Sequence, residues 1–238
     1  MTLRSIPLPI LNSATKYPSI KTYHELGDRG RPTGARRAPP PGEPLIFTEK
    51  VDGTNGRIIV LGDDWIIGSR NDLLAARGDY VTNPAMGIVD ALRPYAEHLR
   101  GIYDRVTVFY AEVYGHKIGA GAKHYTSTDA VGVRLFDVAR IDDATLRSPT
   151  PELAAAARDN GGQSWLTKQG GYGFDVVPTL DLLPPPEDAA DVLAWLPKTT
   201  NVGLDGVAGM CEGVVMRTFD RRWIVKARAE DYARLGRK

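Results

Sequence analysis

The chain has 238 residues, a formal net charge of +1 at pH 7 and a single cysteine, Cys211. One cysteine excludes a disulfide framework and a cysteine-based zinc site, and a hydrophobic fraction of 42% is enough to fill a core. No apolar run is long enough to span a bilayer, and the N-terminus lacks the pattern of a signal peptide. We therefore expect a cytoplasmic protein with no membrane partner, while the near-zero net charge leaves nucleic acid open as a partner.

Residues 1 to 44 are expected to form an N-terminal segment with a loop rich in Gly, Pro and Arg. Residues 28 to 44 are dense in Gly, Pro and Arg, with Pro39 to Pro41 in sequence, which is typical of an exposed loop. For the arginines of this loop we favour a solubilising role over contact with a phosphate backbone.

An apolar run from Leu45 to Phe47 leads to Lys50, and Asp52 and Gly53 follow two and three positions later. Strand alternation predicts that Lys50 and Asp52 share one face, and Gly53 allows a tight turn beside a ligand. A lysine attacks only as the neutral amine, so a catalytic lysine needs cationic neighbours, a metal or burial. By itself the motif also fits a solvated strand end. Whether Lys50 is catalytic therefore depends on the residues in the rest of the chain.

A hairpin is expected next, with strands at 58 to 61 and 65 to 67 and a turn at 62 to 64. Arg70 follows this hairpin, where it either grips a phosphate or pairs with a nearby aspartate on the surface. Apolar residues then recur at helical spacing from 86 to 99, which predicts an amphipathic helix kinked or split at Pro94.

Two β-rich runs follow this helix. The run from 106 to 113 contains Glu112, a carboxylate that needs a partner such as a cation or a ligand hydroxyl, although an edge position would also suit it. The run from 131 to 138 contains Phe136, which by itself is more typical of a core residue than of a base-stacking one.

Between residues 139 and 209 we expect helices over 151–157 and 186–196 and a short strand ending at Pro178, with no motif that carries chemistry. Two more strands follow, at 211–217 and 223–228. A hairpin turn between them sets Glu212 and Lys226 in adjacent strands. A short, charged, helical tail ends the chain.

Many strands and few helices predict one α+β domain of antiparallel sheets with flanking helices and a central cleft. We divide it into an N-terminal segment at 1–44, a catalytic core at 45–228 and a basic tail at 229–238. Taken in order, the charged and aromatic residues of the core resemble the motifs of the covalent nucleotidyltransferases, the superfamily of polynucleotide ligases and mRNA capping enzymes. The residues that carry this resemblance are Lys50, Asp52, Gly53, Arg70, Glu112, Phe136, Glu212, Gly213 and Lys226.

Within the superfamily the chain looks most like ATP-dependent RNA ligases of the phage RNA ligase 2 type, because of Asn55 and Arg70. Two residues depart from that type: Asp52 stands where many members have histidine, and Ile224 stands where the last motif has its first lysine. The chain stops shortly after Lys226, so we expect no OB-fold of the kind that DNA ligases and capping enzymes append, nor the C-terminal domain of the RNA ligase 2 type. A separate partner domain or protein, or a minimal stand-alone ligase, would then supply the missing function.

The resemblance implies a nucleotide cleft in which ATP and Mg²⁺ or Mn²⁺ act on RNA ends or a nicked duplex. It makes Lys50 the nucleophile that forms lysyl-AMP, and Asp52 and Lys226 its catalytic partners. Glu212 and Asp52 would bind the metal. The nucleotide would be bound by Glu49, Asn55, Arg70, Glu112, Phe136, Glu212 and Lys226.

RNA phosphates would be contacted by the basic residues of the C-terminal stretch, which are Arg217, Arg221, Arg222, Arg228, Arg234, Arg237 and Lys238. Two other readings stay open. One is a small DNA ligase or a GTP-dependent capping enzyme, and the other is a catalytically inactive module that binds nucleotide or RNA.

Overall fold

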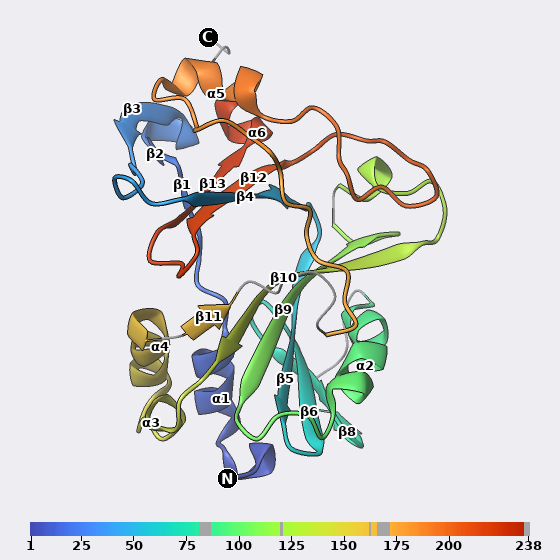
Figure 1. Ribbon diagram of the computed structural model, residues 1–238. Helices are drawn as coiled ribbons and strands as arrows, with labels where there is room; N and C mark the ends of the chain where they lie inside the picture. The colour runs from blue at the N-terminus through green and yellow to red at the C-terminus, as the bar shows by residue number, and fades with distance from the viewer. Residues whose placement is uncertain (81–86, 120, 162, 166–171, 236–238) are drawn as a thin grey trace.

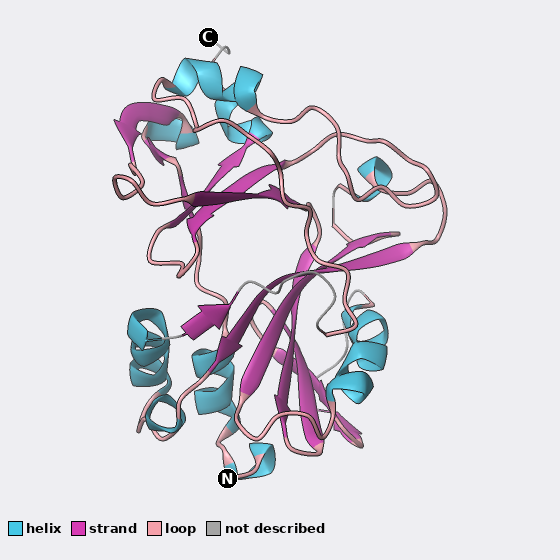
Figure 2. Ribbon diagram, viewed as in Figure 1, coloured by secondary structure: helices cyan, strands magenta, loops and turns pink. Residues whose placement is uncertain are grey.

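The computed structural model describes residues 1–80, 87–119, 121–161, 163–165 and 172–235. Two large sheets, one antiparallel and one mixed, lie one above the other, with helices on their outer sides (Figures 1 and 2). The α+β class with antiparallel sheets and few helices is confirmed.

The lower sheet has seven strands in the order β11-β10-β9-β5-β6-β7-β8, and every neighbouring pair is antiparallel. The expected hairpin at 58–67 forms its centre. The strands are β5 (Thr54–Leu61), β6 (Asp64–Ser69), β7 (Leu73–Ala76), β8 (Asp79–Tyr80), β9 (Thr107–Gly115), β10 (Val131–Arg140) and β11 (Gln163–Trp165).

Both faces of this sheet are buried, which explains its unbroken apolar runs. In β5, Ile58 and Val60 enter a core under one helix, while Ile59 enters a second core on the opposite face. Helix α2 (Ile88–Leu99) covers the first face. The second face is covered by α1 (Leu8–Thr15), α3 (Asp143–Leu146) and α4 (Pro151–Gly161).

Helix α2 runs through Pro94 as one helix, so the expected split is absent. Its apolar stripe, including Leu92 and Leu99, is buried against the sheet. This packing stabilises the helix although Pro94 has no backbone N–H to donate. Residue 86, where the predicted apolar pattern begins, lies outside the described residues.

The upper sheet has four strands in the order β1-β13-β12-β4, with β1 (Lys21–Thr22) parallel to β13 (Ile224–Arg228). The expected C-terminal hairpin is present, because β13 pairs antiparallel with β12 (Gly213–Thr218), and β12 pairs with β4 (Leu45–Lys50). Helices α5 (Ala189–Trp195) and α6 (Ala229–Tyr232) lie on one face of this sheet.

Three local expectations need correction. Helix α1 was not expected; its buried Leu11 packs on the lower sheet, and Pro9 is tolerated in the first turn. Residues 28–44 are not wholly a loop, since β3 (Pro32–Arg36) pairs with β2 (His24–Leu26). The strand ending at Pro178 is instead two isolated bridges, at residues 176 and 179, because the chain there crosses from one sheet to the other.

The chain passes from the upper to the lower sheet directly after Lys50, where β4 ends and, four residues later, β5 begins. The lysine motif therefore lies at the junction of the two sheets. Within the described residues, no helix combines the length and the apolar character needed to cross a membrane.

Candidate active site

A cavity of about 370 Å³ lies between the two sheets. Strands β4, β12 and β13 contribute one side, strands β5, β9 and β10 the other, and residues 17–20 also line it. Of the nine site residues expected from the sequence, Asp52 and Glu212 lie outside the lining. The seven that line it are Glu49, Lys50, Asn55, Arg70, Glu112, Phe136 and Lys226.

Lys50 is the last residue of β4 and lies opposite Gly213 of β12. Its Nζ donates a hydrogen bond to Oε2 of Glu212 at 2.6 Å, and both side chains are partly buried. Burial raises the pKa of Glu212, while the Lys50 charge acts in the opposite direction. Glu212 thus touches the candidate nucleophile although it does not line the cavity.

Strand alternation in β13 places three residues on the cavity face, namely Ile224, Lys226 and Arg228, while Val225 and Ala227 enter the core. Burial lowers the pKa of Lys226, and the nearby Arg228 and Lys50 charges lower it further. From the sequence we expect Lys226 of this strand in the nucleotide site and Arg228 in contact with RNA phosphates.

Arg228 therefore is the second cation that β13 contributes to the cavity wall, two residues after Lys226. Its guanidinium is held by two hydrogen bonds of 2.9 Å to the fully buried carboxylate of Asp231. This bidentate pairing fixes the side chain in place. The spacing of one intervening residue, expected of two lysines in the last motif, is met by Lys226 and Arg228.

Glu112 of β9 lies directly opposite Asn55 of β5. Burial raises the pKa of Glu112 to about 7, against a smaller lowering by Lys50. Asn55 Oδ1 is buried with no hydrogen-bond partner among the described residues. An unpaired buried acceptor is costly, so this pair forms a polar wall suited to a ligand with hydroxyl or amino donors.

The raised pKa of Glu112 predicts a specific pH dependence of stability. The folded protein holds a proton on Glu112 that the unfolded chain releases near pH 4.5, so this contribution is complete below pH 4.5 and is lost as the pH rises through about 7. Between pH 4.5 and pH 8 the wild type should lose up to about 3 kcal/mol of unfolding free energy relative to Glu112→Gln. Urea titrations of both proteins at several pH values measure this difference, and parallel pH profiles would contradict the shift.

Phe136 of β10 lines the cavity and packs edge-on against Tyr17, with ring centroids 5.0 Å apart. The Tyr17 hydroxyl donates to Asp137 Oδ2 at 2.8 Å. Tyr17 was not identified from the sequence, because it lies more than one hundred residues from its partners in a segment with no motif. An aromatic residue between Lys16 and Pro18 was the only local signal.

Glu49 also lines the cavity, but both its carboxylate oxygens are engaged elsewhere. Oε1 accepts a hydrogen bond from the Thr200 hydroxyl, and Oε2 accepts one from the Asn201 N–H at 2.9 Å. The carboxylate therefore anchors the loop after α5 to the lysine strand. The sequence shows no motif that carries chemistry between residues 139 and 209, and it gives no signal for this contact with Glu49.

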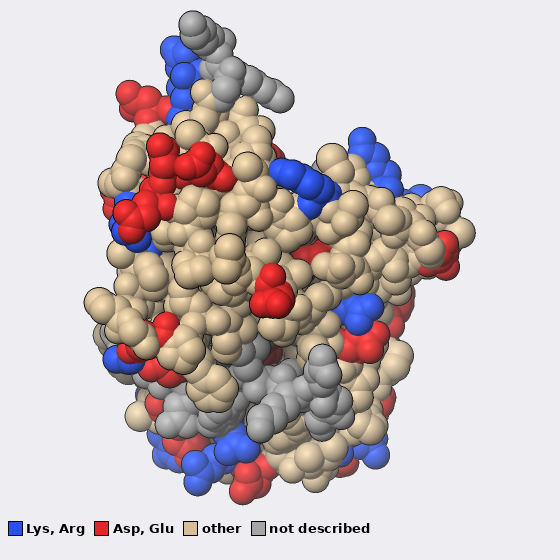
Figure 3. Space-filling model, turned by 45° about the horizontal axis from the view of Figure 1, so that its top comes forward, with Lys and Arg blue, Asp and Glu red and all other residues tan. Residues whose placement is uncertain are grey.

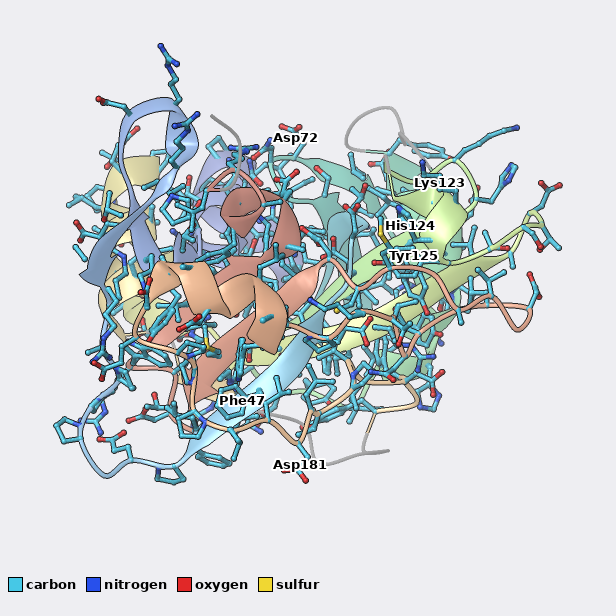
Figure 4. All side chains as sticks on the ribbon, turned by 90° about the horizontal axis from the view of Figure 1, so that it is seen from above. Phe47, Asp72, Lys123, His124, Tyr125 and Asp181 are labelled. Carbon is cyan, nitrogen blue, oxygen red and sulfur yellow. The ribbon has the colours of Figure 1, made fainter. Side chains whose placement is uncertain are left out.

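Asp52 lies beside the cavity, with its carboxylate against the backbone of Gly121. Its own N–H donates to the hydroxyl of Tyr125 at 2.7 Å, and Tyr125 follows the 3-10 turn that contains Lys123 and His124 (Figure 4). The Asp52 charge contributes to the raised pKa of Glu212. Its predicted roles in catalysis and metal binding stay predictions.

Gly53 has no room for a side chain. A Cβ atom there would lie 2.3 Å from the carbonyl oxygen of Val113 and 2.9 Å from Cβ of Tyr114. Gly53→Ala should therefore lower the unfolding free energy by about 3 kcal/mol and displace Lys50 from its position. Urea denaturation measures the loss. Gly34→Ala, where a Cβ meets no atom within 4 Å, is the matched control and should cost under about 0.5 kcal/mol; equal losses would contradict the account.

Arg70 lines the cavity at its exposed edge, where its Nη2 donates to the Ser19 hydroxyl at 3.0 Å. One of the two roles expected of Arg70 was an ion pair with a nearby aspartate on the surface. The structure shows the hydrogen bond to Ser19 instead. The segment after α1 and the loop after β6 thereby meet at the cavity mouth.

The arginines of the C-terminal stretch do not form one exposed array. Arg217 is buried against Asp137, and Arg222 is bound to Asp220 and Glu43. Positive and negative side chains are interspersed on the face shown in Figure 3. The expectation that this stretch as a whole contacts RNA phosphates is thus weakened, and residues 237 and 238 lie outside the described residues.

The family model described as RNA ligase matches residues 43–231. This chain belongs to the RNA ligase family. The matched range contains both the lysine motif and the C-terminal hairpin, so the family resemblance seen in the sequence is confirmed.

Solved structures of an RNA ligase from Naegleria gruberi have the same fold. One mutant with AMP and Mn is 22% identical, with a TM-score of 0.54, and the match covers 92% of this chain and 63% of that one. Another mutant with ATP and Mn is 18% identical, with a TM-score of 0.55 and coverage of 95% and 63%. A structure with PPi is 18% identical, with a TM-score of 0.53 and coverage of 92% and 64%.

The chain thus spans less than two thirds of the length of these ligases. No curated protein matches it.

Proposed function

We propose that this member of the RNA ligase family is an ATP-dependent enzyme that joins a 3′-hydroxyl to a 5′-phosphate through lysyl-AMP. The observation that carries the proposal is the position of Lys50. It lines a cavity at the junction of the sheets, touches Glu212 and lies among the cations Lys226 and Arg228. The Naegleria gruberi ligases in complex with ATP, AMP and PPi are consistent with this chemistry.

In the first step the neutral amine of Lys50 attacks the α-phosphorus of ATP. The N–P bond forms, the bond from the α-phosphorus to the bridging oxygen breaks, and pyrophosphate leaves with the electron pair. Glu212, whose pKa is raised by burial, is placed to take the proton that Lys50 releases. Lys226 and Arg228 neutralise charge on the phosphate oxygens as the transition state forms.

The rest of the cavity positions the nucleoside. Phe136 offers a ring face for the adenine, with Val215 among the lining residues from the facing sheet. The Glu112 and Asn55 pair offers acceptors for ribose hydroxyls. Stacking of this kind contributes about 1 to 3 kcal/mol per base.

A divalent cation, Mg²⁺ or Mn²⁺, would supply charge neutralisation at the phosphates. No group of three or more His, Cys, Asp or Glu side chains in the described part of the chain is arranged to hold a metal by itself. Mg²⁺ is commonly bound by one or two carboxylates plus water and substrate phosphates, and Glu212 with Asp52 beside it fits that requirement.

The second and third steps need a polynucleotide. AMP passes from Lys50 to the oxygen of a 5′-phosphate end, and the 3′-hydroxyl then attacks that phosphorus and displaces AMP. We propose that adenylylation belongs to this chain, because it contains both Lys50 and the cavity that Lys50 lines. Sealing uses either this chain alone or a partner domain or protein, and a cytoplasmic location stays part of the proposal.

An end-joining assay tests this function. The protein is incubated with ATP, Mg²⁺ and either nicked duplex RNA, single-stranded RNA ends or the matching DNA, with 5′-phosphate or 5′-hydroxyl termini. We expect AMP-capped or joined RNA only with ATP and a 5′-phosphate. Label from GTP would favour a capping enzyme, joining of DNA alone a DNA ligase, and no product with any nucleotide an inactive binding module.

A further inference from the structure

Arg217 is a buried cation that the proposed chemistry leaves unused. It lines the cavity from β12 and is only 2% exposed. One nitrogen, Nη1, lies 3.3 Å from Asp137 Oδ2, while Nε and Nη2 are buried and have no hydrogen-bond partner among the described residues. Buried guanidinium donors without partners are costly, so this arrangement points to a ligand.

The charge around Arg217 is unbalanced. Arg221 also reaches Asp137 Oδ2, at 3.4 Å, so two guanidinium groups share this carboxylate. The Tyr17 hydroxyl donates to the same oxygen. A group that completes this cluster must bring negative charge and hydrogen-bond acceptors, and a phosphate oxygen has both.

The register of the upper sheet separates Arg217 from the reacting amine. Lys50 lies opposite Gly213, whereas Arg217 lies opposite Ile46 and Ile224, four residues further along β12. At about 3.3 Å per residue the two positions are about 13 Å apart along the strand. This separation favours a phosphate at Arg217 other than the one that Lys50 attacks.

We propose that Arg217 binds a phosphate group other than the α-phosphate of ATP, through its Nε and Nη2 atoms. This inference rests on the proposed function for the identity of the ligand. The phosphate comes either from the outer phosphates of ATP or from the polynucleotide, and these sources share the same chemistry.

The matched variants are Arg217→Met and Arg221→Met. Both remove a guanidinium from Asp137, but Arg221 does not contribute to the cavity lining. A purely structural role for Arg217 predicts similar effects of the two changes. A phosphate-binding role predicts that only Arg217→Met affects phosphate ligands.

Two measurements separate the sources. Calorimetry on a Lys50→Met background compares the binding of ATP with that of adenosine, which has no phosphate. Rapid-quench assays on pre-adenylylated protein follow AMP transfer to RNA with a 5′-phosphate at increasing RNA concentration. We expect Arg217→Met either to weaken ATP binding or to raise the half-saturating RNA concentration, in each case at least about tenfold. Adenosine binding should be unchanged.

Arg221→Met should stay within about twofold in both measurements. Equal effects of the two variants, or an equal loss for adenosine and ATP, would overturn the proposal. If Arg217→Met does not fold, Arg217→Lys, which keeps the charge with a different donor geometry, should still lose more than Arg221→Met, and an equal loss would again overturn it. A wild type that never becomes labelled would refute the proposed function, yet ATP binding would still test Arg217.

Discussion

Lys50→Met should reduce the transfer of AMP from ATP to the protein by more than about 10⁴-fold, to below detection. Methionine keeps the length and apolar character of the side chain but has no amine to form the N–P bond. The rate is measured with α-labelled ATP under single-turnover conditions.

The fold should survive this change. Lys50 is at the end of β4, where its backbone pairs with β12 and its side chain is partly exposed. We expect the variant to melt within about 5 °C of the wild type and to seal RNA that already carries a 5′-adenylate, since that step does not need the nucleophile. Labelling that persisted in a folded Lys50→Met protein would remove Lys50 from the mechanism.

Glu212→Gln should lower the rate of the same transfer by about 100-fold or more. Its carboxylate makes the 2.6 Å contact with Lys50 Nζ and, in our proposal, accepts the proton and helps hold the metal. Glutamine is close in size but has no negative charge, so the variant should need more Mg²⁺ or Mn²⁺ to reach its own maximal rate.

The labelling rate is measured across metal concentration for Glu212→Gln and for Glu152→Gln, a change at an exposed carboxylate on α4. The control should match the wild type. An unaltered rate and metal dependence in Glu212→Gln would show that Glu212 only forms an ion pair with Lys50.

The main strands of the fold could be predicted because their signals are local. Alternation and turn residues place β4, the hairpin of β5 and β6, and the hairpin of β12 and β13 close to their observed limits. Helix α1 was missed because Pro7, its N-cap, and Pro9, in its first turn, outweighed its apolar spacing in a short segment. Helix α2 continues through Pro94 because it is buried against a sheet formed by distant residues. No local pattern reveals that packing.

The site likewise has residues that the sequence pattern predicts and contacts that it does not. Seven of the nine expected residues line one cavity, because strand order brings the motifs together. The contact of Glu49 with Thr200 and the packing of Tyr17 on Phe136 join segments more than one hundred residues apart, so no local pattern predicts them. Arg217 was grouped with the basic C-terminal stretch, although alternation with Val215 would have placed it on the cavity face.

The most direct test of the account is to locate the covalent nucleotide. Wild-type protein is incubated with ATP and Mg²⁺, denatured, digested and analysed by mass spectrometry under conditions that preserve phosphoramide bonds. The account predicts one AMP on the peptide that contains Lys50, attached at its side-chain nitrogen. An intact folded protein that carries no AMP, or that carries it on another residue, would contradict it.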